Sequence, residues 1–393
     1  MNATPKTNHY LPEDGADEAL LGRVWLPGEV PGPALVRLDG NAVLNITMAG
    51  PTAAELLNAS DPLARLTAAA GNQICSVAEL LDNSAPERRG ADRPHLLAPV
   101  DLHVIKASGV TFTASLMERV IEEQARGEPA RAEQIRRDLG QEIGSDLSQV
   151  RPGSDSAARL KEALVARGLW SQYLEVGIGP DAELFTKAPV LSAVGTGAEV
   201  GIHPASSWNN PEPEVALIVN NRGVIIGATL ANDVNLRDVE GRSALLLGRA
   251  KDNNASCALG PFIRLFDGSF GIDDVRATEI NLRIEGTDGY VLQGQSLMRE
   301  ISRDPEDLVA QAIGANHQYP DGLVLLTGTM FAPVEDRGEA GEGFPHHEGD
   351  VVVISSAKLG TLVNTVARCD QAPPWEFGLT ALMRNLARRG LLN

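Results

Sequence analysis

The fold is decided by the stretch Asn209-Asn-Pro-Glu-Pro-Glu-Val-Ala-Leu-Ile-Val219, which runs through Asn220-Asn-Arg-Gly223 into Gly223-Val-Ile-Ile-Gly-Ala-Thr-Leu230. The two apolar runs are typical of β-strands, and the polar segment between them is typical of a tight turn. The sequence therefore predicts a β-hairpin with two glutamates at the start of its first strand.

The two glutamates of this hairpin indicate a cation site. Glu212 and Glu214 are two residues apart, so in a strand both side chains point to the same face. Pro211 and Pro213 hold the segment extended and remove backbone donors, which suits an edge or the start of a strand. Two like charges side by side are costly unless a cation lies between them. The alternative is a solvated edge whose charges prevent aggregation.

A third carboxylate is expected from the second strand. A turn centred on Asn221 and Arg222 places Glu212 opposite Ala231, with Asp233 on the same face and within diagonal reach. A bulge at Gly223 shifts this register by one. Three carboxylates at one point are hard oxygen ligands, which favour Mg²⁺, Mn²⁺ or Ca²⁺ over zinc.

The rest of the chain predicts an α+β fold that is mainly β. Apolar runs of four to seven residues, bounded by Gly, Asn and Asp, dominate from Phe185 onward, with only peripheral helical segments. Residues 1–98 carry strand-like and short helical patterns and end in a polar, proline-bearing linker over 83–94. We therefore expect a smaller N-terminal α+β domain (1–98) and a larger catalytic domain (99–393).

Composition excludes several classes of partner. The 393 residues carry a formal net charge of −18, which argues against nucleic acid or anionic membrane as the main partner. The three cysteines are widely spaced, so neither a disulfide framework nor a structural zinc site is expected. Residues 1–15 lack the apolar run of a signal peptide, and no apolar stretch approaches the ~20 residues of a membrane span. We expect a soluble, cytoplasmic protein.

Several motifs in order carry a family resemblance. They are Asn-Pro-Glu-Pro-Glu214, Asn232-Asp-Val-Asn-Leu-Arg-Asp238, Lys251-Asp-Asn, Gly260-Pro261 and Gly328-Thr329. Over about residues 100 to 393 this pattern resembles the fumarylacetoacetate hydrolase family. The resemblance implies a mixed β-roll catalytic domain, a Mg²⁺ or similar ion, and a homodimer or homotetramer.

The same resemblance implies the site residues. The family's metal carboxylates correspond to Glu212, Glu214 and Asp233, its active-site lysine to Lys251, and its substrate-contacting pair to Gly328 and Thr329. Lys187, within Phe185-Thr-Lys-Ala-Pro189, resembles a family strand near the site. Arg237 and Arg242 flank the metal strand and are candidates for holding a substrate carboxylate, unless one of them pairs with Asp238 or Glu240.

One departure from the family concerns its lid helix. Hydrolases of the family place a histidine there to activate water, but residues 109–123 contain none, and Glu118 stands about where it would be. This pattern resembles the dehydratases of the family, which act on 2-keto-3-deoxy-pentonates (xylonate or arabinonate) and form 2,5-dioxopentanoate, also called α-ketoglutarate semialdehyde. The expected reaction is enolate formation followed by loss of the C4 hydroxyl.

Glu118 is the predicted acid or base, with Glu122 and Glu123 as alternatives on the same helix. Lys251 is predicted to be the cation beside the enolate, with a Schiff-base nucleophile as the alternative. Two other functions stay open. One is an acylpyruvate-type C–C hydrolase or decarboxylase on the same metal, and the other is a non-catalytic, metal-stabilised β domain.

Overall fold

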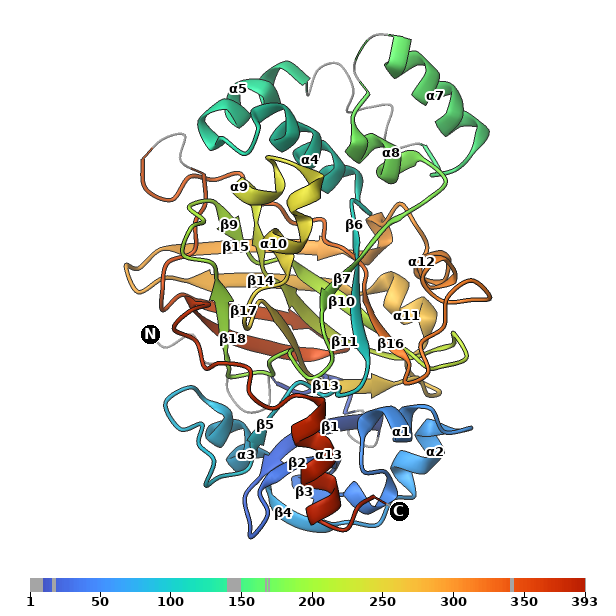
Figure 1. The fold of residues 1–393 in the computed structure, drawn as a ribbon, viewed down its shortest axis with the longest axis vertical. Coiled ribbons are helices and arrows are strands. Elements are labelled where there is room, and N and C mark those ends of the chain that lie inside the picture. Colours follow the sequence, from blue (N-terminus) through green and yellow to red (C-terminus); the bar gives the residue numbers. More distant parts are fainter. Residues whose placement is uncertain are drawn as a thin grey trace.

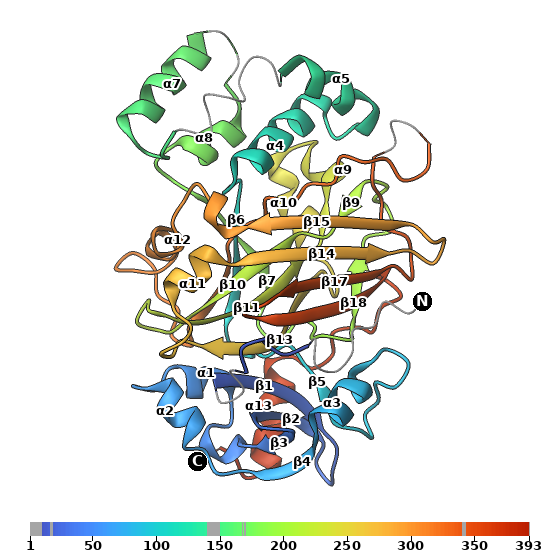
Figure 2. The same cartoon turned by 180° about the vertical axis from the view of Figure 1, so that it is seen from behind.

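The computed structural model describes residues 10–15, 19–139, 150–166, 168, 170–339 and 343–392. Three layers follow one another along the long axis (Figure 1). The N-terminal segment forms a small lobe at one end, a β-rich body lies in the middle, and helices cover the other end. The view from behind (Figure 2) shows the same succession of layers.

A large mixed sheet runs from the N-terminal lobe through the body. Its strands pair antiparallel except for one parallel pair, β16 with β6. In spatial order they are β4 (Asn72–Ser76), β3 (Ala42–Asn45), β2 (Gly32–Asp39), β1 (Leu20–Leu26), β13 (Cys257–Leu265), β11 (Ile225–Asp233), β10 (Pro213–Val219), β16 (Leu323–Leu326), β6 (Val104–Gly109) and β7 (Glu183–Ala188), with β5 (His95–Leu96) beside β1.

A second sheet of five strands packs against the first. Its order is β15 (Val291–Leu297), β14 (Glu279–Glu285), β17 (Val351–Ser356), β18 (Gly360–Arg368) and β8 (Glu199–Ile202). A short pair, β9 (Asn209–Asn210) and β12 (Asn235–Leu236), lies beside the site. The main core fills the space between the two large sheets, where Val215 and Leu217 of β10 meet Leu282 and Ile354. Because side chains alternate between the two faces of a strand, Glu212 and Glu214 point away from that core.

Helices lie at the periphery of the sheets. They are α1 (Ala53–Leu57), α2 (Pro62–Thr67), α3 (Val77–Ser84), α4 (Thr113–Ala125), α5 (Pro129–Leu139), α7 (Asp155–Ala166), α8 (Gln172–Ile178), α9 (Arg237–Glu240), α10 (Leu247–Lys251), α11 (Ile272–Ala277), α12 (Pro305–Ala312) and α13 (Leu379–Arg388). Helices α4, α5, α7 and α8 form the layer above the body (Figure 1). Their apolar faces share a core of their own, in which Leu116 and Val120 of α4 meet Tyr173 and Leu174 of α8. Because α4 also borders the carboxylates of β10, this layer covers the candidate site.

The domain boundary at residue 98 stays a prediction, and two contacts cross it. Strand β1 of the N-terminal lobe pairs with β13 of the body, so one sheet is continuous through both. The last helix, α13, packs against the N-terminal strands (Figure 1), where Asn385 donates to the carbonyl of Pro31 at 2.7 Å and Arg389 to that of Pro33 at 2.6 Å. The C-terminal segment therefore contributes to the N-terminal lobe.

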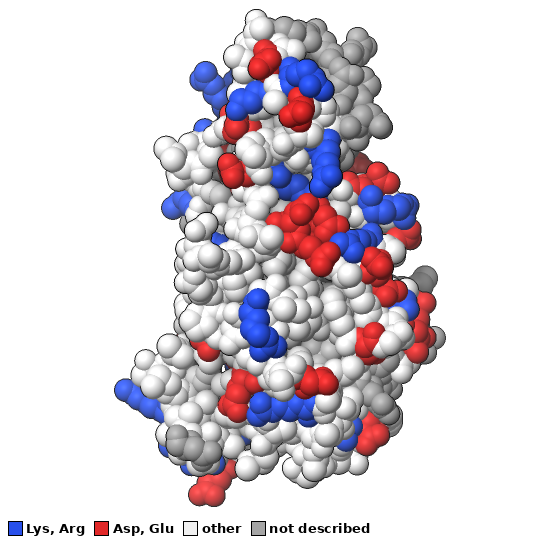
Figure 3. Space-filling model, turned by 90° about the vertical axis from the view of Figure 1, so that its right-hand side faces the viewer, with Lys and Arg blue, Asp and Glu red and all other residues white. Residues whose placement is uncertain are grey.

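The predicted fold class is confirmed: the architecture is α+β and mainly β, with mixed sheets. All three cysteines are free thiols. Within the described ranges, no helix combines the length and the apolarity that crossing a membrane requires. Acidic and basic side chains are mixed over the face in Figure 3, with an acidic patch between the helical layer and the body.

Candidate active site

The hairpin of β10 and β11 exists, but its register differs from the prediction. Glu214, not Glu212, lies opposite Ala231, because the turn spans Asn220 to Val224, with a bulge near Val219, and is longer than a tight turn. The predicted pairing of Glu212 with Ala231 is therefore wrong. The shift amounts to two residues, and side chains alternate with a period of two, so the same side chains stay on the same face.

The three predicted metal carboxylates converge. One carboxylate oxygen from each of Glu212, Glu214 and Asp233 lies within 4.8 Å of the others, and all three residues are buried. Asp233 donates its backbone N–H to the carbonyl of Glu212 at 3.0 Å, which holds the two segments of the hairpin together at this point. Burial, and then the charge of Asp233, raises the pKa of Glu214 well above its usual range. A divalent cation coordinated by oxygen relieves that repulsion, so the residues fit a hard metal ion.

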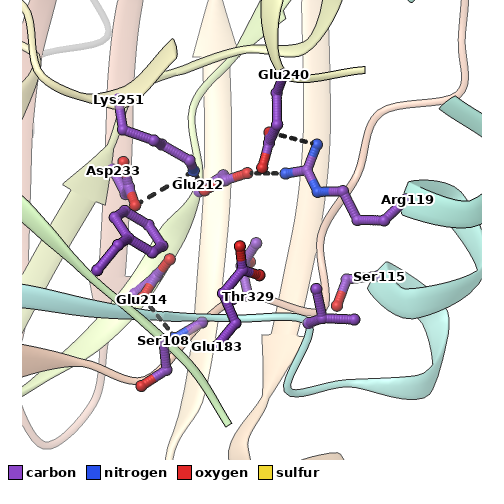
Figure 4. A pocket seen from close by; sticks show the side chains of 14 residues that line it. Ser108, Ser115, Arg119, Glu183, Glu212, Glu214, Asp233, Glu240, Lys251 and Thr329 are labelled. Atoms are coloured by element: carbon purple, nitrogen blue, oxygen red, sulfur yellow. Dashed lines mark hydrogen bonds and ion pairs between the residues drawn. The ribbon is translucent and has the colours of Figure 1, made fainter. Parts of the chain in front are cut away.

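Two lysines face the triad from neighbouring elements. Lys251, at the end of α10, donates to Glu212 and lies 3.3 Å from Asp233 (Figure 4). Burial alone lowers the pKa of Lys251, but the carboxylates of Asp233 and Glu212 outweigh burial and raise it above its usual range. Lys187 of β7 is fully buried, 2.7 Å from the second oxygen of Asp233, and donates to the carbonyls of Val234 and Lys251. Lys187 thus holds Asp233 and the end of α10 in place.

Gly328 and Thr329 lie at the other side of the same pocket, after β16. The backbone N–H of Gly328 donates to Glu214 at 2.6 Å. Gly328 has φ +85°, and a side chain there would clash with Thr111, so the close approach requires glycine. The hydroxyl oxygen of Thr329 accepts from Phe331 N–H at 3.1 Å, which leaves its proton free to donate into the pocket.

Helix α4, the predicted lid helix, brings Arg119 and not Glu118 into contact with the triad. Arg119 contacts Glu122 at 2.6 Å. It also contacts Glu212 at 2.6 Å and Glu240 at 2.8 Å, and these two residues are drawn beside it in Figure 4. Glu118 lies 3.3 Å from Arg237 and does not line the pocket. The predicted acid or base is therefore not among the groups that the structure brings together.

Arg237 is engaged with the protein itself. Its guanidinium contacts Glu122 at 2.7 Å, donates to the carbonyl of Pro333 at 2.5 Å and stacks 4.4 Å above the ring of Trp208. It is buried and does not line the pocket. Its acid partners are Glu118 and Glu122 on the lid helix, in place of the expected Asp238 or Glu240.

Sequence reasoning missed Glu183. It lies on β7 and its carboxylate points into the pocket (Figure 4). Alternation along this strand was the available signal, since Glu183 and Phe185 share a face that leads to Lys187, a residue already singled out. Burial, and then the charge of Glu240, raises the pKa of Glu183 to about 7.

Most residues that line the pocket are small or polar. The lining consists of Ser108, Gly109, Val110, Ser115, Arg119, Glu183, Phe185, Glu212, Glu214, Asp233, Glu240, Lys251, Gly328 and Thr329. Phe185 lies beneath Lys251, with the ammonium 5.7 Å from the ring centre. Such a lining suits a small polar ligand that carries negative charge toward a metal ion and Lys251.

Comparison with known proteins agrees with this site. The family model described as fumarylacetoacetate (FAA) hydrolase C-terminal matches residues 176–367. The chain is 32% identical over 229 residues to 2-dehydro-3-deoxy-D-arabinonate dehydratase of Saccharolobus solfataricus, covering 58% of this chain and 71% of that protein. It is 31% identical over 194 residues to a probable 2-keto-3-deoxyxylonate dehydratase of Haloferax volcanii, covering 49% and 63%.

Solved structures show the same fold. 2-Keto-3-deoxy-D-arabinonate dehydratase complexed with magnesium and 2,5-dioxopentanoate superposes with a TM-score of 0.61 at 20% identity. The match covers 89% of this chain and 99% of that one. The matched family region contains the triad, Glu183 and Lys251, and the Saccharolobus relative is matched over more than two thirds of its length. This chain belongs to the fumarylacetoacetate hydrolase family.

Proposed function

We propose that this protein is a metal-dependent hydro-lyase. It removes water from a 2-keto-3-deoxy-D-pentonate, the xylonate or the arabinonate, and forms 2,5-dioxopentanoate. The observation that carries this proposal is the buried triad of Glu212, Glu214 and Asp233 with the ammonium of Lys251 beside it. The names of both curated relatives, and the magnesium and product in a structure of the same fold, support it.

Each residue of the site has a part in this reaction. Glu212, Glu214 and Asp233 would hold Mg²⁺, or Mn²⁺ or Ca²⁺ in its place. When bound, the ion supplies a Lewis acid that stabilises negative charge on the oxygens of a 2-keto acid. Lys251 places its ammonium beside the developing enolate, and Thr329 donates its free hydroxyl proton to the substrate carboxylate or ketone.

Two predicted substrate contacts take a different part. Lys187 acts through Asp233 and the end of α10, to which its ammonium is bonded, so we assign it to positioning the metal ligands. Arg237 fixes the lid helix through Glu122. The groups that meet the substrate then come from the triad, Lys251, Thr329 and the pocket wall.

The lid helix favours dehydration over hydrolysis. Hydrolytic cleavage of a carbon–carbon bond needs a base that activates water, and α4 offers no histidine for this purpose. Its residue nearest the triad is Arg119, a guanidinium that stays protonated and cannot serve as a base. Loss of a hydroxyl that is already on the substrate requires no added water.

A direct assay tests the proposed function. The purified protein with Mg²⁺ is incubated with 2-keto-3-deoxy-D-xylonate or 2-keto-3-deoxy-D-arabinonate, and the aldehyde proton of 2,5-dioxopentanoate is followed by NMR. We expect product with Mg²⁺ and none after removal of metal with EDTA, with activity restored by added Mg²⁺. Turnover of acetylpyruvate in place of both sugar acids would identify a hydrolase, and turnover of none would reject an enzyme of this class.

We also propose a cytoplasmic location, consistent with three free thiols, and assembly into a homodimer or homotetramer, as the family resemblance implies. Light scattering after size-exclusion chromatography measures the assembly, and a monomer would reject it.

A further inference from the structure

A cavity separate from the active site lies where the N-terminal lobe meets the body, and we call it the interlobe cavity. Four segments line it, which are residues 86–89 after α3, residues 191–199 between β7 and β8, residues 254–255 after α10 and residues 373–375 before α13. Its volume of about 340 Å³ falls in the range of small-molecule sites, roughly 300–1,000 Å³. Among the described residues, the two cavities share no lining residue, so each can hold a molecule of its own.

Hydrogen bonds hold the walls of the interlobe cavity in place. Asn254 donates a side-chain N–H to the carbonyl of Pro373 at 3.2 Å, which ties the wall before α13 to the segment after α10. Asn364 donates to the carbonyls of Gly195 and Ala198 at 3.1 Å and 3.0 Å, which holds the connection between β7 and β8. The cavity is therefore preformed, and a ligand that enters it does not have to order the chain around it.

Arg89 brings to this cavity a positive charge that the protein does not balance. Its side chain is half-buried, and within the described ranges it forms no ion pair and donates one hydrogen bond, to the carbonyl of Thr196 at 3.3 Å. Glu199 also lines the cavity but does not pair with Arg89. Burial lowers the pKa of Arg89 to about 10, so the guanidinium is still charged at neutral pH. Its free N–H groups favour a carboxylate, which a planar guanidinium binds through two parallel hydrogen bonds.

The rest of the lining favours a flat apolar body on that carboxylate. Leu191, Val194 and Ala255 offer aliphatic surface, and Trp375 stands at the cavity with 47% of its surface exposed. The indole N–H of Trp375 donates to a backbone carbonyl at 3.3 Å, so its ring adds apolar surface and no free donor. One cation suits one negative charge, and the carboxylate of Glu199 repels a second. Phosphate monoesters and polyhydroxylated sugar acids are therefore poorly matched to this cavity.

One segment connects the interlobe cavity with the active site. Residues 251–256 begin at Lys251, which lines the active-site pocket, and include Asn254 and Ala255, which line the interlobe cavity. The hydroxyl of Ser256 closes this segment on itself by donating to the carbonyl of Lys251 at 2.8 Å. A molecule that contacts Asn254 and Ala255 therefore acts on the same short segment that positions Lys251.

We propose that the interlobe cavity is a second, non-catalytic site that binds a small monocarboxylate with a flat apolar body. The guanidinium of Arg89 holds the carboxylate, and the apolar body lies against Trp375 and the aliphatic wall. Occupancy of the site is transmitted through residues 251–256 to Lys251, which contacts Glu212 of the triad. The site is independent of the reaction proposed for the active-site pocket.

Binding is tested with 4-fluorobenzoate and with its neutral analogue 4-fluorobenzamide. Protein loaded with Mg²⁺ is titrated into each probe, and the ¹⁹F NMR signal reports binding. We expect 4-fluorobenzoate to bind with a dissociation constant of about 5 mM or tighter, and the amide to bind at least about tenfold more weakly. Inorganic phosphate at the same concentration should not displace the probe. Absence of 4-fluorobenzoate binding up to about 10 mM, or equal binding of the amide, would overturn the proposal.

Two neighbouring arginines locate the bound probe. Arg89→Met should weaken 4-fluorobenzoate binding at least about tenfold, because it removes the charge that holds the carboxylate. Arg88→Met is the matched control and should bind as wild type does, since Arg88 is exposed, pairs with Asp82 and does not line the cavity. Trp375→Ala should weaken binding severalfold, because part of the apolar wall is lost. Folded Arg89→Met, judged by circular dichroism, that binds the probe as wild type does would overturn the proposal.

Mg²⁺ affinity tests the transmission to Lys251. Calorimetry should show that saturating 4-fluorobenzoate changes the Mg²⁺ affinity at least about threefold in wild type and in Arg88→Met, and not in Arg89→Met. Mg²⁺ should change the affinity for 4-fluorobenzoate by the same factor, since such coupling is reciprocal. Independent affinities would overturn the transmission, while loss of probe binding in Arg89→Met alone would still support the site. Turnover enters neither measurement, so a failed dehydratase assay would reject the proposed function and not this site.

Discussion

Two buried carboxylate clusters lie side by side in this protein, and they differ in how their charge is balanced. In the lid cluster, Glu118, Glu122 and Glu240 each contact a guanidinium of Arg119 or Arg237. The triad of Glu212, Glu214 and Asp233 is contacted by the ammonium groups of Lys251 and Lys187. One carboxylate oxygen from each of its residues lies within 4.8 Å of the others. Burial opposes ionisation in both clusters. Each lid carboxylate contacts a guanidinium, whereas Glu214 of the triad contacts no cation within the described residues, so the placement of the cations, not their number, distinguishes the clusters.

The pKa directions express this difference. Burial tends to raise the pKa of Glu122, but Arg119 and Arg237 outweigh burial and hold that pKa below its usual range. Burial and neighbouring carboxylates raise the pKa of Glu214 well above its range. The negative charge of the lid cluster is therefore balanced by the protein itself, whereas the triad gains stability from an added cation. The comparison teaches that carboxylates form a structural network in one place and a candidate binding site in the other, according to where their cations lie.

The largest effect is expected from changing the triad. Glu214→Gln removes one ligand charge, so turnover should fall by about a thousandfold, which corresponds to several kcal/mol of metal assistance. Metal-free protein should become slightly more stable, because repulsion in the triad is reduced, while Mg²⁺ no longer raises its unfolding temperature. Differential scanning fluorimetry with EDTA and with Mg²⁺ measures both. A variant that still gains as much stability from Mg²⁺ as wild type would show that the ion binds elsewhere.

A change in the lid cluster should affect stability more than chemistry. Arg237→Met breaks a buried ion pair with Glu122, and the loss should be about 3 kcal/mol of the free energy of unfolding. Below the unfolding transition kcat/KM should stay within about threefold of wild type, because Arg237 does not line the pocket. Arg299→Met is the matched control, since Arg299 and Glu279 form a half-exposed pair whose loss should cost under about 1 kcal/mol. Urea unfolding compares the two, and a large rise in KM for Arg237→Met would restore Arg237 as a substrate contact.

The smallest effect, no change at all, is expected when borohydride is added during turnover. The triad raises the pKa of Lys251, which keeps the amine protonated and prevents it from attacking a ketone. Intact-protein mass spectrometry should therefore find no covalent adduct after reduction in the presence of substrate. An adduct on Lys251 would mean that the triad does not hold this lysine in its charged form, and a Schiff-base mechanism would replace the enolate mechanism.

The sequence predicted the triad better than its strand register. Spacing of two between Glu212 and Glu214 fixes a shared face in any strand, and this property survives a register error of two residues. The turn could not be predicted, because hydrogen bonds of Asn220 with Val224 and Gly223 lengthen it.

The lid helix shows where sequence reasoning ended. A helix at α4 is indicated by its pattern, but which of its charged residues reaches the triad depends on how the helix is rotated about its axis, since adjacent residues point about 100° apart. Glu118 and Arg119 are adjacent in sequence and point to different partners. Glu183 escaped notice although it shares a strand face with Lys187, because its place in the pocket also depends on the pairing of β7 with β6.

Local patterns alone determined a strand-rich fold and an acidic hairpin that suits a hard cation, because alternation, turn residues and like-charge spacing act over a few positions. The lysine beside that hairpin was predicted from the family resemblance. Only the tertiary structure decided which carboxylates are neutralised by arginine, which ones line the pocket, and that the last helix returns to the N-terminal strands. Those outcomes depend on contacts between segments tens to hundreds of residues apart, whose distances are set by packing of the whole chain.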